Sequence, residues 1–404
     1  MEAVRTKVIG IGGAGVNSVN HLLAQPYPHL SYLVIDTDIK TLQSIQMTEK
    51  LEKLTIGHTV TRGLSSGGDA SVALKALELD KEKIEASLQN VDLLFIIAGL
   101  GGGVGSVIAS YIARLAMKQG TLVISLVMMP FTLEGSKKHQ LAEKTLGDLR
   151  IAGHVTIPLP NDLLLQSLPR SATVNEAFEL ASFWIRCAVN AISGMIYEVG
   201  IINLDFSSLK HIFSNGGGKT LFGLGAAQGA DYCKRALNEV ACCPILYTPH
   251  AHQSADSLLI NIKGGKNLSL QNIHDIGAFL SSHFNSKENT AIGAIIDETR
   301  EDYLEIVVIG ISDINKGSPR SVSSVRSDGK SYPQQQFLFD DLPPETKNEK
   351  RRSPKKPIGG NDPTDLDNMA IGRGYFGQLE PILINGEDID IPTYLRRGIK
   401  IELY

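Results

Sequence analysis

Short apolar runs alternate with amphipathic stretches from the start of the chain to residue 170. The runs are strand-sized, and several of the stretches between them carry apolar residues at helical spacing. This alternation predicts βαβ units and a largely parallel sheet. The expected strands are Lys7–Ile11, Tyr32–Ile35, Leu93–Ala98, Thr121–Val127 and His154–Ile157.

A single long helix is predicted from Thr173 to Val199, because apolar residues recur there at helical spacing. These residues are Ala177, Ala181, Trp184, Ala188, Ile192 and Met195. A helix of this length spans about 40 Å, the width of a domain, so it can join two domains. A second α/β set is expected from Leu221 to Ser312. Its expected strands are Leu258–Ile262, Ala291–Ile296 and Leu304–Ile309, and its expected helices are Asp231–Val240 and Leu270–Phe284.

The composition changes after Ser312. Residues 316–373 are rich in Ser, Pro, Lys, Gln and Asp, which predicts a disordered linker. Apolar residues return between Asp388 and Arg397, as is typical of a docking peptide. The sequence thus predicts an α/β fold with a Rossmann-like nucleotide-binding domain (1–172), a long central helix (173–200), a smaller α/β domain (201–312), a disordered linker (313–380) and a docking peptide (381–404).

Composition and charge argue against several classes of protein. With 43% hydrophobic and 20% charged residues, the bulk of the chain is expected to be an ordinary globular protein. The net charge of −4 argues against a nucleic-acid binder. No signal peptide is recognised, and no apolar run reaches the ~18 residues of a membrane helix, so we expect a cytoplasmic protein without direct membrane insertion. The cysteines lack metal-ligand spacing, so no metal site is expected from them.

The first candidate site is the glycine-rich turn Gly10–Gly15, which follows a strand and opens a helix. Glycine lets the backbone approach a phosphate, and a helix N-terminus presents free N–H groups. Asp36 lies at the end of the next strand, 21 residues beyond Gly15, as in dinucleotide-binding Rossmann motifs. This turn alone does not distinguish between nucleotides.

A second glycine-rich turn favours a polyphosphate site over an NAD-type Rossmann site. Leu93–Ala98 leads into Gly99–Ser106, where five of the first seven residues are glycine, and a helical pattern follows from Val107. Each glycine costs conformational entropy, so this density indicates a nest of backbone N–H groups around phosphate oxygens. Two such turns on one sheet can clamp a polyphosphate from two sides, whereas an NAD-type Rossmann enzyme needs only the first.

Several segments together resemble the tubulin/FtsZ family, over roughly Lys7–Ile311 and again in the C-terminal peptide. The most specific segment is Gly99–Ser106, which resembles the glycine-rich phosphate signature of the family. The supporting segments follow the family's order and spacing: Asp36–Asp38, Pro130–Gly135, Pro160–Asp162, Asn203–Phe206 and Asp390–Arg397.

The resemblance implies that GTP or GDP binds, with Mg²⁺, on the loops of the first domain. It places these residues at the nucleotide: Gly12, Gly13, Ala14, Gly15, Val16, Asn17, Asp36, Gly101, Gly102, Gly103, Val104, Gly105, Ser106, Glu134, Lys138, Asn161, Phe178 and Ser182. It also implies that Asn203 and Asp205 enter the nucleotide pocket of the next subunit, where an acid polarises the attacking water. The chain is therefore expected to assemble with itself, head to tail.

At the C-terminus the resemblance implies a peptide that recruits membrane anchors or other division proteins. The residues expected to dock are Ile391, Pro392, Tyr394, Leu395, Arg396 and Arg397. These implications together describe a GTPase of bacterial cell division, located in the cytoplasm at the division site.

Departures from the family pattern bear on hydrolysis. Val104 stands where Thr is usual, and Lys138 where Arg is usual. Ser182 replaces the Asn or Asp that would bond the guanine edge, and Ser208 replaces the second acid of the catalytic loop. Asp36 stands where Asn is usual and would repel a phosphate. Binding is still expected, because backbone groups supply most of it, but hydrolysis is expected to be slow.

Two other functions stay open at this point. A filament or scaffold that binds nucleotide without hydrolysing it fits the same departures. An NAD-type Rossmann enzyme fits the first glycine-rich turn, but the second turn and the lack of a catalytic His or Lys constellation disfavour it.

Overall fold

The computed structural model describes residues 4–163, 168, 171–213, 217–247, 254–286, 289–312, 383–384 and 387–388. Met1–Ser323 forms one compact unit, and Ser324–Tyr404 forms another. Within the second unit, β11 (Leu383–Ile384) pairs antiparallel with β12 (Glu387–Asp388). The expected linker and all the expected docking residues lie outside the described residues, so those two assignments stay predictions of the sequence.

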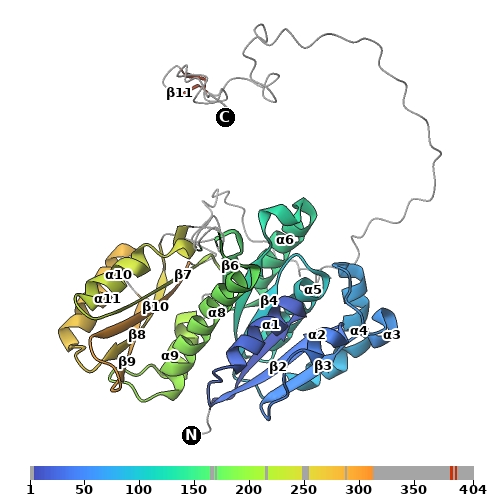
Figure 1. Ribbon diagram of the computed structural model, residues 1–404, viewed down its shortest axis with the longest axis horizontal. Helices are drawn as coiled ribbons and strands as arrows, with labels where there is room; N and C mark the ends of the chain where they lie inside the picture. The colour runs from blue at the N-terminus through green and yellow to red at the C-terminus, as the bar shows by residue number, and fades with distance from the viewer. Residues whose placement is uncertain are drawn as a thin grey trace, which may run out of the picture. The chain divides into compact units, whose positions relative to one another are not determined.

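The first sheet has six strands in the order β3-β2-β1-β4-β5-β6, and all its neighbours are parallel (Figure 1). The strands are β1 (Thr6–Ile11), β2 (Leu30–Asp36), β3 (Leu51–Thr55), β4 (Leu93–Gly99), β5 (Leu122–Met129) and β6 (Val155–Pro160). The connecting helices are α1 (Gly12–Leu23), α2 (Ile39–Gln43), α3 (His58–Thr61), α4 (Ala70–Ser87), α5 (Gly103–Lys118) and α6 (Ser136–Ala152), with the short turn η1 (Thr132–Glu134). This order confirms the predicted Rossmann-like domain.

Alternate side chains of each strand enter two separate cores, because successive residues of a strand point to opposite faces. In β4, Leu93, Phe95 and Ile97 join the core under α1 and the central helix, whereas Leu94 and Ile96 join the core under α4, α5 and α6. Both faces of the sheet are therefore covered, and its strands read as continuous apolar runs.

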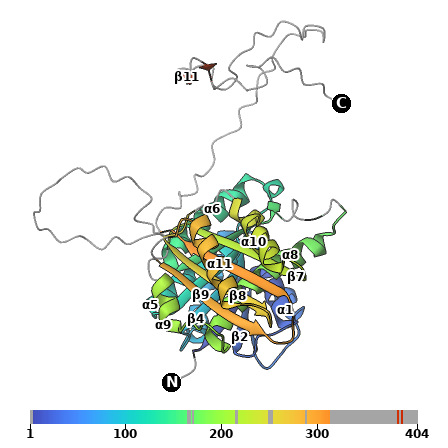
Figure 2. The same ribbon diagram turned by 90° about the vertical axis from the view of Figure 1, so that its left-hand side faces the viewer.

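The second sheet has the order β7-β10-β8-β9, with β10 antiparallel to both its neighbours and β8 parallel to β9. Its strands are β7 (Thr220–Gln228), β8 (Ser257–Gly265), β9 (Asn289–Asp297) and β10 (Tyr303–Ile311). The helices of this part are α9 (Phe206–Phe213), α10 (Tyr232–Ala241) and α11 (Leu270–His283), with the turn η2 (Pro244–Tyr247). Figure 2 shows α10 and α11 in front of this sheet, on the side away from the first sheet.

The long helix α8 (Val174–Tyr197) confirms the prediction of a central helix. It begins with a capping box, in which the Glu176 N–H donates to Thr173 Oγ1 at 3.3 Å and the Thr173 N–H donates to Glu176 Oε2 at 2.6 Å. Asn175–Tyr197 is long and apolar enough to cross a membrane by length and composition alone. Because 67% of its most apolar window is buried inside the fold, we assign it as a core helix.

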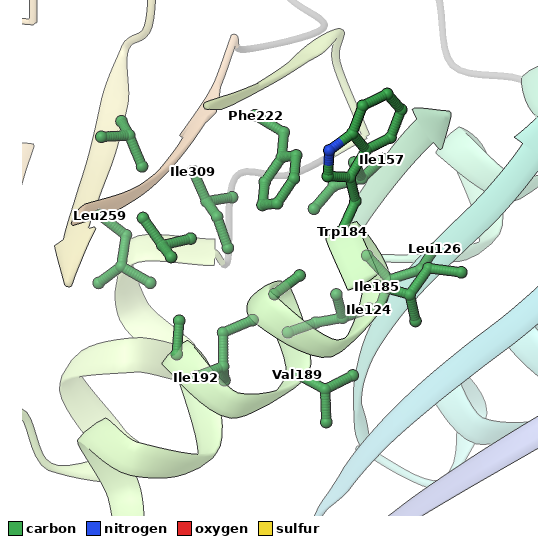
Figure 3. Close-up of a cluster of buried hydrophobic side chains, with 14 of the residues drawn as sticks. Ile124, Leu126, Ile157, Trp184, Ile185, Val189, Ile192, Phe222, Leu259 and Ile309 are labelled. Atoms are coloured by element: carbon green, nitrogen blue, oxygen red, sulfur yellow. The ribbon is translucent and has the colours of Figure 1, made fainter. Parts of the chain in front are cut away.

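Side chains from both sheets meet on α8 and form one continuous apolar core (Figure 3). The helix contributes Trp184, Ile185, Val189 and Ile192, the first sheet contributes Ile124, Leu126 and Ile157, and the second contributes Phe222, Leu259 and Ile309. The two sheets therefore share a core through this helix, so α8 cannot move along its axis without disturbing the packing on both sides.

This shared core predicts a large effect of Ile185→Ala, because Ile185 is fully buried on α8. We expect a loss of about 2–5 kcal/mol in the free energy of unfolding, from lost burial and the cavity left behind. Urea unfolding followed by the fluorescence of Trp184, the single tryptophan, measures the change. The matched control is Ile151→Ala on α6, where the side chain is 78% exposed and the expected change is within about 0.5 kcal/mol. Equal losses in the two variants would contradict the role given to α8.

Candidate nucleotide site and catalytic loop

A cavity of about 450 Å³ opens at the carboxyl ends of the parallel strands. This edge is where ligands bind in open α/β sheets. Segments after β1, β2, β4, β5 and β6, together with the start of α8, contribute to its wall. The lining residues are Ile11, Gly12, Gly13, Ala14, Asp36, Asp38, Thr41, Ser65, Ser66, Gly67, Gly68, Gly99, Leu100, Gly102, Gly103, Val104, Gly105, Met128, Pro130, Phe131, Glu134, Lys138, Asn161 and Phe178.

Two helices begin at this cavity. α1 begins at Gly12 and α5 begins at Gly103, and the residues of both first turns line the wall. The first N–H groups of a helix have no partner within the helix, and they carry the positive end of its dipole. Two such ends facing one cavity make a strong site for an anion such as a polyphosphate.

The glycines of the two turns have different roles. A Cβ on Gly105 would lie 2.2 Å from the Gly99 carbonyl oxygen, so this glycine is required for the turn to close on itself. Gly12 has a φ of +70°, and a Cβ there would lie 3.3 Å from the Gly105 N atom, so the two turns are close together. By contrast, a Cβ on Gly13 or Gly102 would meet no atom within 4 Å. These two glycines leave open space for a ligand beside the backbone.

Glu134 and Lys138 stand together on the wall. The Lys138 Nζ atom lies 2.8 Å from Glu134 Oε2, and Glu134 Oε1 accepts a hydrogen bond from the Phe131 N–H at 2.9 Å. Burial by itself would raise the pKa of Glu134, but Lys138 and the Phe131 N–H outweigh burial and lower it. Glu134 is therefore an anion at neutral pH, available to accept bonds from sugar hydroxyl groups.

Carboxylates outnumber cations on the cavity wall. Among the described residues of the wall, the acids are Asp36, Asp38 and Glu134, and the one basic side chain is Lys138. Asp36 is only 4% exposed, and its Oδ1 atom accepts hydrogen bonds from the Thr37 N–H at 2.7 Å and the Asp38 N–H at 3.3 Å. Burial raises its pKa above the ordinary value, against the opposing effect of these bonds. Backbone N–H groups are therefore the main donors that this part of the wall offers to an anionic ligand.

Most of the expected binding residues come together at this cavity. Those that line it are Gly12, Gly13, Ala14, Asp36, Gly102, Gly103, Val104, Gly105, Glu134, Lys138, Asn161 and Phe178. Those that the structure places outside its wall are Gly15, Val16, Asn17, Gly101, Ser106 and Ser182. Three of these residues have structural roles instead. A Cβ on Gly15 would lie 2.4 Å from the Ile97 carbonyl oxygen, so Gly15 lets α1 pack against β4. The Ser106 hydroxyl accepts a hydrogen bond from the Gly101 N–H at 3.0 Å and closes the second turn.

Ser182 lies on a different surface. It is 6% exposed and lines a second hollow of about 400 Å³. The same hollow is lined by His21 of α1 and by Glu179, Phe183 and Arg186 of α8. Because Phe178 lines the first cavity, the two hollows share the N-terminal half of α8.

One wall of the cavity was missed by the sequence analysis. The segment Ser65–Gly68 lies between α3 and α4 and lines the cavity beside the second glycine-rich turn, where a Cβ on Gly103 would lie 2.6 Å from Ser66 Oγ. In the sequence, this segment could be recognised only by the composition Ser-Ser-Gly-Gly and by Asp69, which follows it and caps α4. The same pattern is typical of an ordinary loop before a helix. Only its place next to the carboxyl edge of the sheet connects it to the site.

The loop with the expected catalytic residues is held by its own side chains. Asn203 Oδ1 accepts the Gly200 N–H at 2.7 Å, and Asp205 Oδ1 accepts the Ser208 N–H at 2.7 Å. Asp205 thus stands in front of α9 as a helix cap does. Hydrogen bonds from Ser208 hold the pKa of Asp205 below its ordinary value, so it is ionised at neutral pH.

This loop lies at the opposite end of α8 from the cavity. α8 has 24 residues and is therefore about 36 Å long. Phe178, near its start, lines the cavity. At its end, the Tyr197 hydroxyl lies 2.6 Å from Thr6 Oγ1, at the amino end of β1. Beyond the loop, the Lys210 Nζ atom donates to the Gly120 carbonyl oxygen just before β5, at the same edge of the sheet. Asp205 therefore cannot reach the cavity of its own chain.

Comparisons with known proteins agree with this geometry. The model of the tubulin/FtsZ family GTPase domain matches residues 5–169, and the model of the FtsZ family C-terminal domain matches residues 218–314. Among solved structures, an empty FtsZ dimer from M. jannaschii has 28% sequence identity and a TM-score of 0.70, covering 78% of this chain and 90% of that chain. A GTPγS-bound protofilament of CetZ2 from Haloferax volcanii has 19% identity and a TM-score of 0.63, covering 78% and 96%, and at that identity it supports the fold alone.

The two matched segments follow each other in the order expected for one family, and the solved FtsZ structure shares the fold of both. The two glycine-rich turns fall in the first matched segment, and the loop beyond α8 lies between the two segments. The chain thus belongs to the tubulin/FtsZ family of cytoskeletal GTPases, as a divergent member.

Proposed function

We propose that this protein is a GTP-dependent filament protein of bacterial cell division, which acts in the cytoplasm at the division site. Its subunits associate head to tail, and GTP is hydrolysed slowly at each junction. The observation that carries the proposal is the placement of the anion-binding cavity and the Asp205 loop at opposite ends of α8. A residue that cannot reach its own cavity can act only on the cavity of a neighbour.

The ligand of the cavity is GTP or GDP. The helix N-termini at Gly12 and Gly103 would hold the phosphates through backbone N–H groups, and Glu134 would accept bonds from the ribose. The excess of carboxylates fits a polyphosphate that arrives with Mg²⁺, because the cation offsets the repulsion. When bound, Mg²⁺ would neutralise charge on the phosphates. Asp38 is the acid that would hold it through water.

At the junction, Asp205 of one subunit would polarise a water molecule against the nucleotide of the next. Its low pKa keeps it ionised, and its exposed carboxylate is free of ion pairs among those found in the described residues. One of its oxygens already caps α9, and Ser208 supplies no second carboxylate. These features support slow turnover.

A nucleotide-binding filament without hydrolysis is the second candidate. The observation that favours it is the engagement of Asp205 Oδ1 with the Ser208 N–H, which gives this carboxylate a purely structural role if no water reaches it. An NAD-type enzyme is disfavoured by the family assignment and by the second helix N-terminus at the cavity.

We expect saturable binding of GTP and GDP, in preference to ATP and NAD, in calorimetric titrations. Gly102→Leu should weaken GTP binding by at least about tenfold, about 1.4 kcal/mol, because Gly102 lines the cavity with open space beside it. The matched control is Gly147→Leu on α6, which also has open space but does not line the cavity. Preferential binding of NAD, or an unchanged affinity in Gly102→Leu, would contradict the assignment of the site.

Asp36→Asn should raise the affinity for GTP by about threefold to tenfold, the effect of removing one like charge at several ångströms. Because burial raises the pKa of Asp36, the wild-type affinity should gain as the pH falls through that pKa and the carboxyl becomes neutral. Asn cannot ionise, so the variant should lack this pH-dependent gain in affinity.

In the free protein, the raised folded-state pKa of Asp36 means that stability falls as the pH rises through that pKa. Asp36→Asn should flatten this slope. Identical pH profiles of wild type and variant, in titrations with Mg²⁺, would rule out the role given to Asp36.

Turnover per subunit should rise through a threshold of protein concentration, because each active site needs two subunits. Asp205→Ala should lower turnover by about 10²–10⁴-fold, with little change in GTP affinity. Ser208→Asp should raise turnover by restoring a second carboxylate. Mixing Asp205→Ala with Gly102→Leu should restore activity at about a quarter of the junctions, those that pair an intact cavity with an intact loop. A mixture no more active than its parts, or turnover that is flat from high dilution upward, would show that the site is not shared.

A further inference from the structure

A cluster of aromatic and acidic side chains closes the far end of α8, just before the Asp205 loop. It consists of Tyr27 and His29, from the segment between α1 and β2, and Tyr197 and Glu198, at the end of α8. The Tyr27 hydroxyl donates to Glu198 Oε1 at 2.6 Å. The rings of His29 and Tyr197 stack at 26° with centroids 4.8 Å apart. We refer to these four residues as the end lock.

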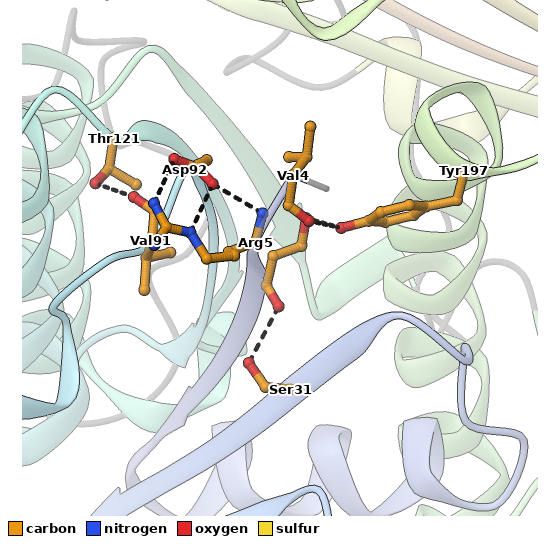
Figure 4. A network of polar contacts seen from close by, with 8 residues as sticks. Val4, Arg5, Ser31, Val91, Asp92, Thr121 and Tyr197 are labelled. Carbon is orange, nitrogen blue, oxygen red and sulfur yellow. Dashed lines mark hydrogen bonds and ion pairs between the residues drawn. The ribbon is translucent and has the colours of Figure 1, made fainter. Parts of the chain in front are cut away.

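The end lock is joined to the first strand of the nucleotide domain. The Tyr197 hydroxyl donates to the Val4 carbonyl oxygen at 2.8 Å and lies 2.6 Å from Thr6 Oγ1. Figure 4 shows this contact beside the paired side chains of Arg5 and Asp92, which join the starts of β1 and β4. The end of α8 is therefore fixed to the amino edge of the first sheet by directional bonds as well as by apolar packing.

Burial makes these contacts stronger than ordinary surface bonds. Tyr27 and Tyr197 are partly buried, and burial raises the pKa of both hydroxyls, with Glu198 adding to the effect at Tyr27. Tyr27 therefore stays protonated and donates a charge-assisted bond to the Glu198 carboxylate. Such a hydrogen bond holds the Tyr27 and Glu198 side chains at a defined distance and orientation, which apolar contacts do not.

The loop beyond the end lock is tied on two further sides. The Ile201 N–H donates to the Ala294 carbonyl oxygen of β9 at 2.8 Å, and a Cβ on Gly200 would lie 2.4 Å from the same oxygen. After the loop, Lys210 donates to the Gly120 carbonyl oxygen at 2.8 Å. The segment 200–205 is thus held by contacts to both sheets, and the end lock is the contact nearest to its start.

We propose that Tyr197 and Glu198 are positioning residues for Asp205. The end lock fixes the start of the loop to the nucleotide domain, so that Asp205 projects at a constant place toward the next subunit. This role rests on the proposed function, since it concerns the same junction. The reason is geometric, because a shift of about 1 Å in a catalytic group can cost up to about a hundredfold in rate.

The test compares two tyrosine–glutamate pairs of equal chemistry. In the end lock the Tyr27 hydroxyl bonds Glu198 at 2.6 Å, and in the control the Tyr111 hydroxyl of α5 bonds Glu85 of α4 at 2.7 Å, also partly buried. The variants are Tyr27→Phe and Glu198→Ala, against Tyr111→Phe and Glu85→Ala. Glu198→Gln keeps an oxygen acceptor for Tyr27 and serves as the conservative rescue.

Each variant is measured in the full chain for GTP affinity, turnover above the assembly threshold, and amide hydrogen exchange in residues 199–205. Breaking the end lock should lower turnover by about tenfold to a hundredfold and speed exchange in the loop, with GTP affinity unchanged. Glu198→Gln should retain most of the turnover, and the control pair should change neither quantity.

The readouts separate the two proposals. If the wild-type protein shows no GTP turnover at any concentration, the proposed hydrolysis is refuted. The hydrogen-exchange data would still decide whether the end lock holds the loop. Unchanged exchange in Glu198→Ala, or equal losses of turnover in the control pair, would overturn the positioning role.

Discussion

The packing of α8 between two sheets is the constraint on which the rest of the structure depends. Its apolar residues belong to one core shared by the first and second sheets, so the helix is held along its whole length. A rigid helix of about 36 Å sets the separation between the cavity at one end and the Asp205 loop at the other. Because of this separation, any joint action of the two would have to take place between subunits. In the proposed function, this alone would couple nucleotide hydrolysis to filament assembly.

In the proposed function, the cavity would bind its ligand through backbone N–H groups rather than through side-chain charge. The described side chains of its wall carry more negative than positive charge, which by itself would repel a polyphosphate. The two helix N-termini would supply the attraction instead, and Gly13 and Gly102 leave open space for a ligand beside the backbone. Under this proposal, a chain that differs from the family pattern at Val104, Lys138 and Asp36 would still keep a phosphate site, because backbone N–H groups do not change with the side chain.

In the proposed function, the Asp205 loop would combine a structural and a chemical task in few residues. Asn203 and Asp205 each give one oxygen to a backbone N–H of the loop or of α9, which leaves the second oxygen of Asp205 as the group that can face a neighbour. The polar contacts at the end of α8 and at Lys210 then decide where that oxygen lies relative to the nucleotide domain. Catalysis as proposed would therefore depend on positions set by both sheets at once.

The sequence by itself determined the elements with strong local signals. The buried strands, the long helix from Thr173, and the two glycine-rich turns follow from periodicity and from the conformational freedom of glycine. Local signals did not reveal β3 and β7. β3 is short and its central residues are charged, and β7 is interrupted by Gly223 and Gly225, so pairing with β2 and β10 decides both.

Only the tertiary structure decided which residues share the site. Gly15 and Gly105 look alike in sequence, yet the first packs α1 against β4 and the second lines the cavity. Ser65–Gly68 reaches the cavity because α3 and α4 bring it there, and Tyr27 meets Glu198 across 171 residues of chain. Such contacts between distant segments leave no periodic or compositional trace, because they arise from the way the elements pack and not from the neighbours of each residue in the chain.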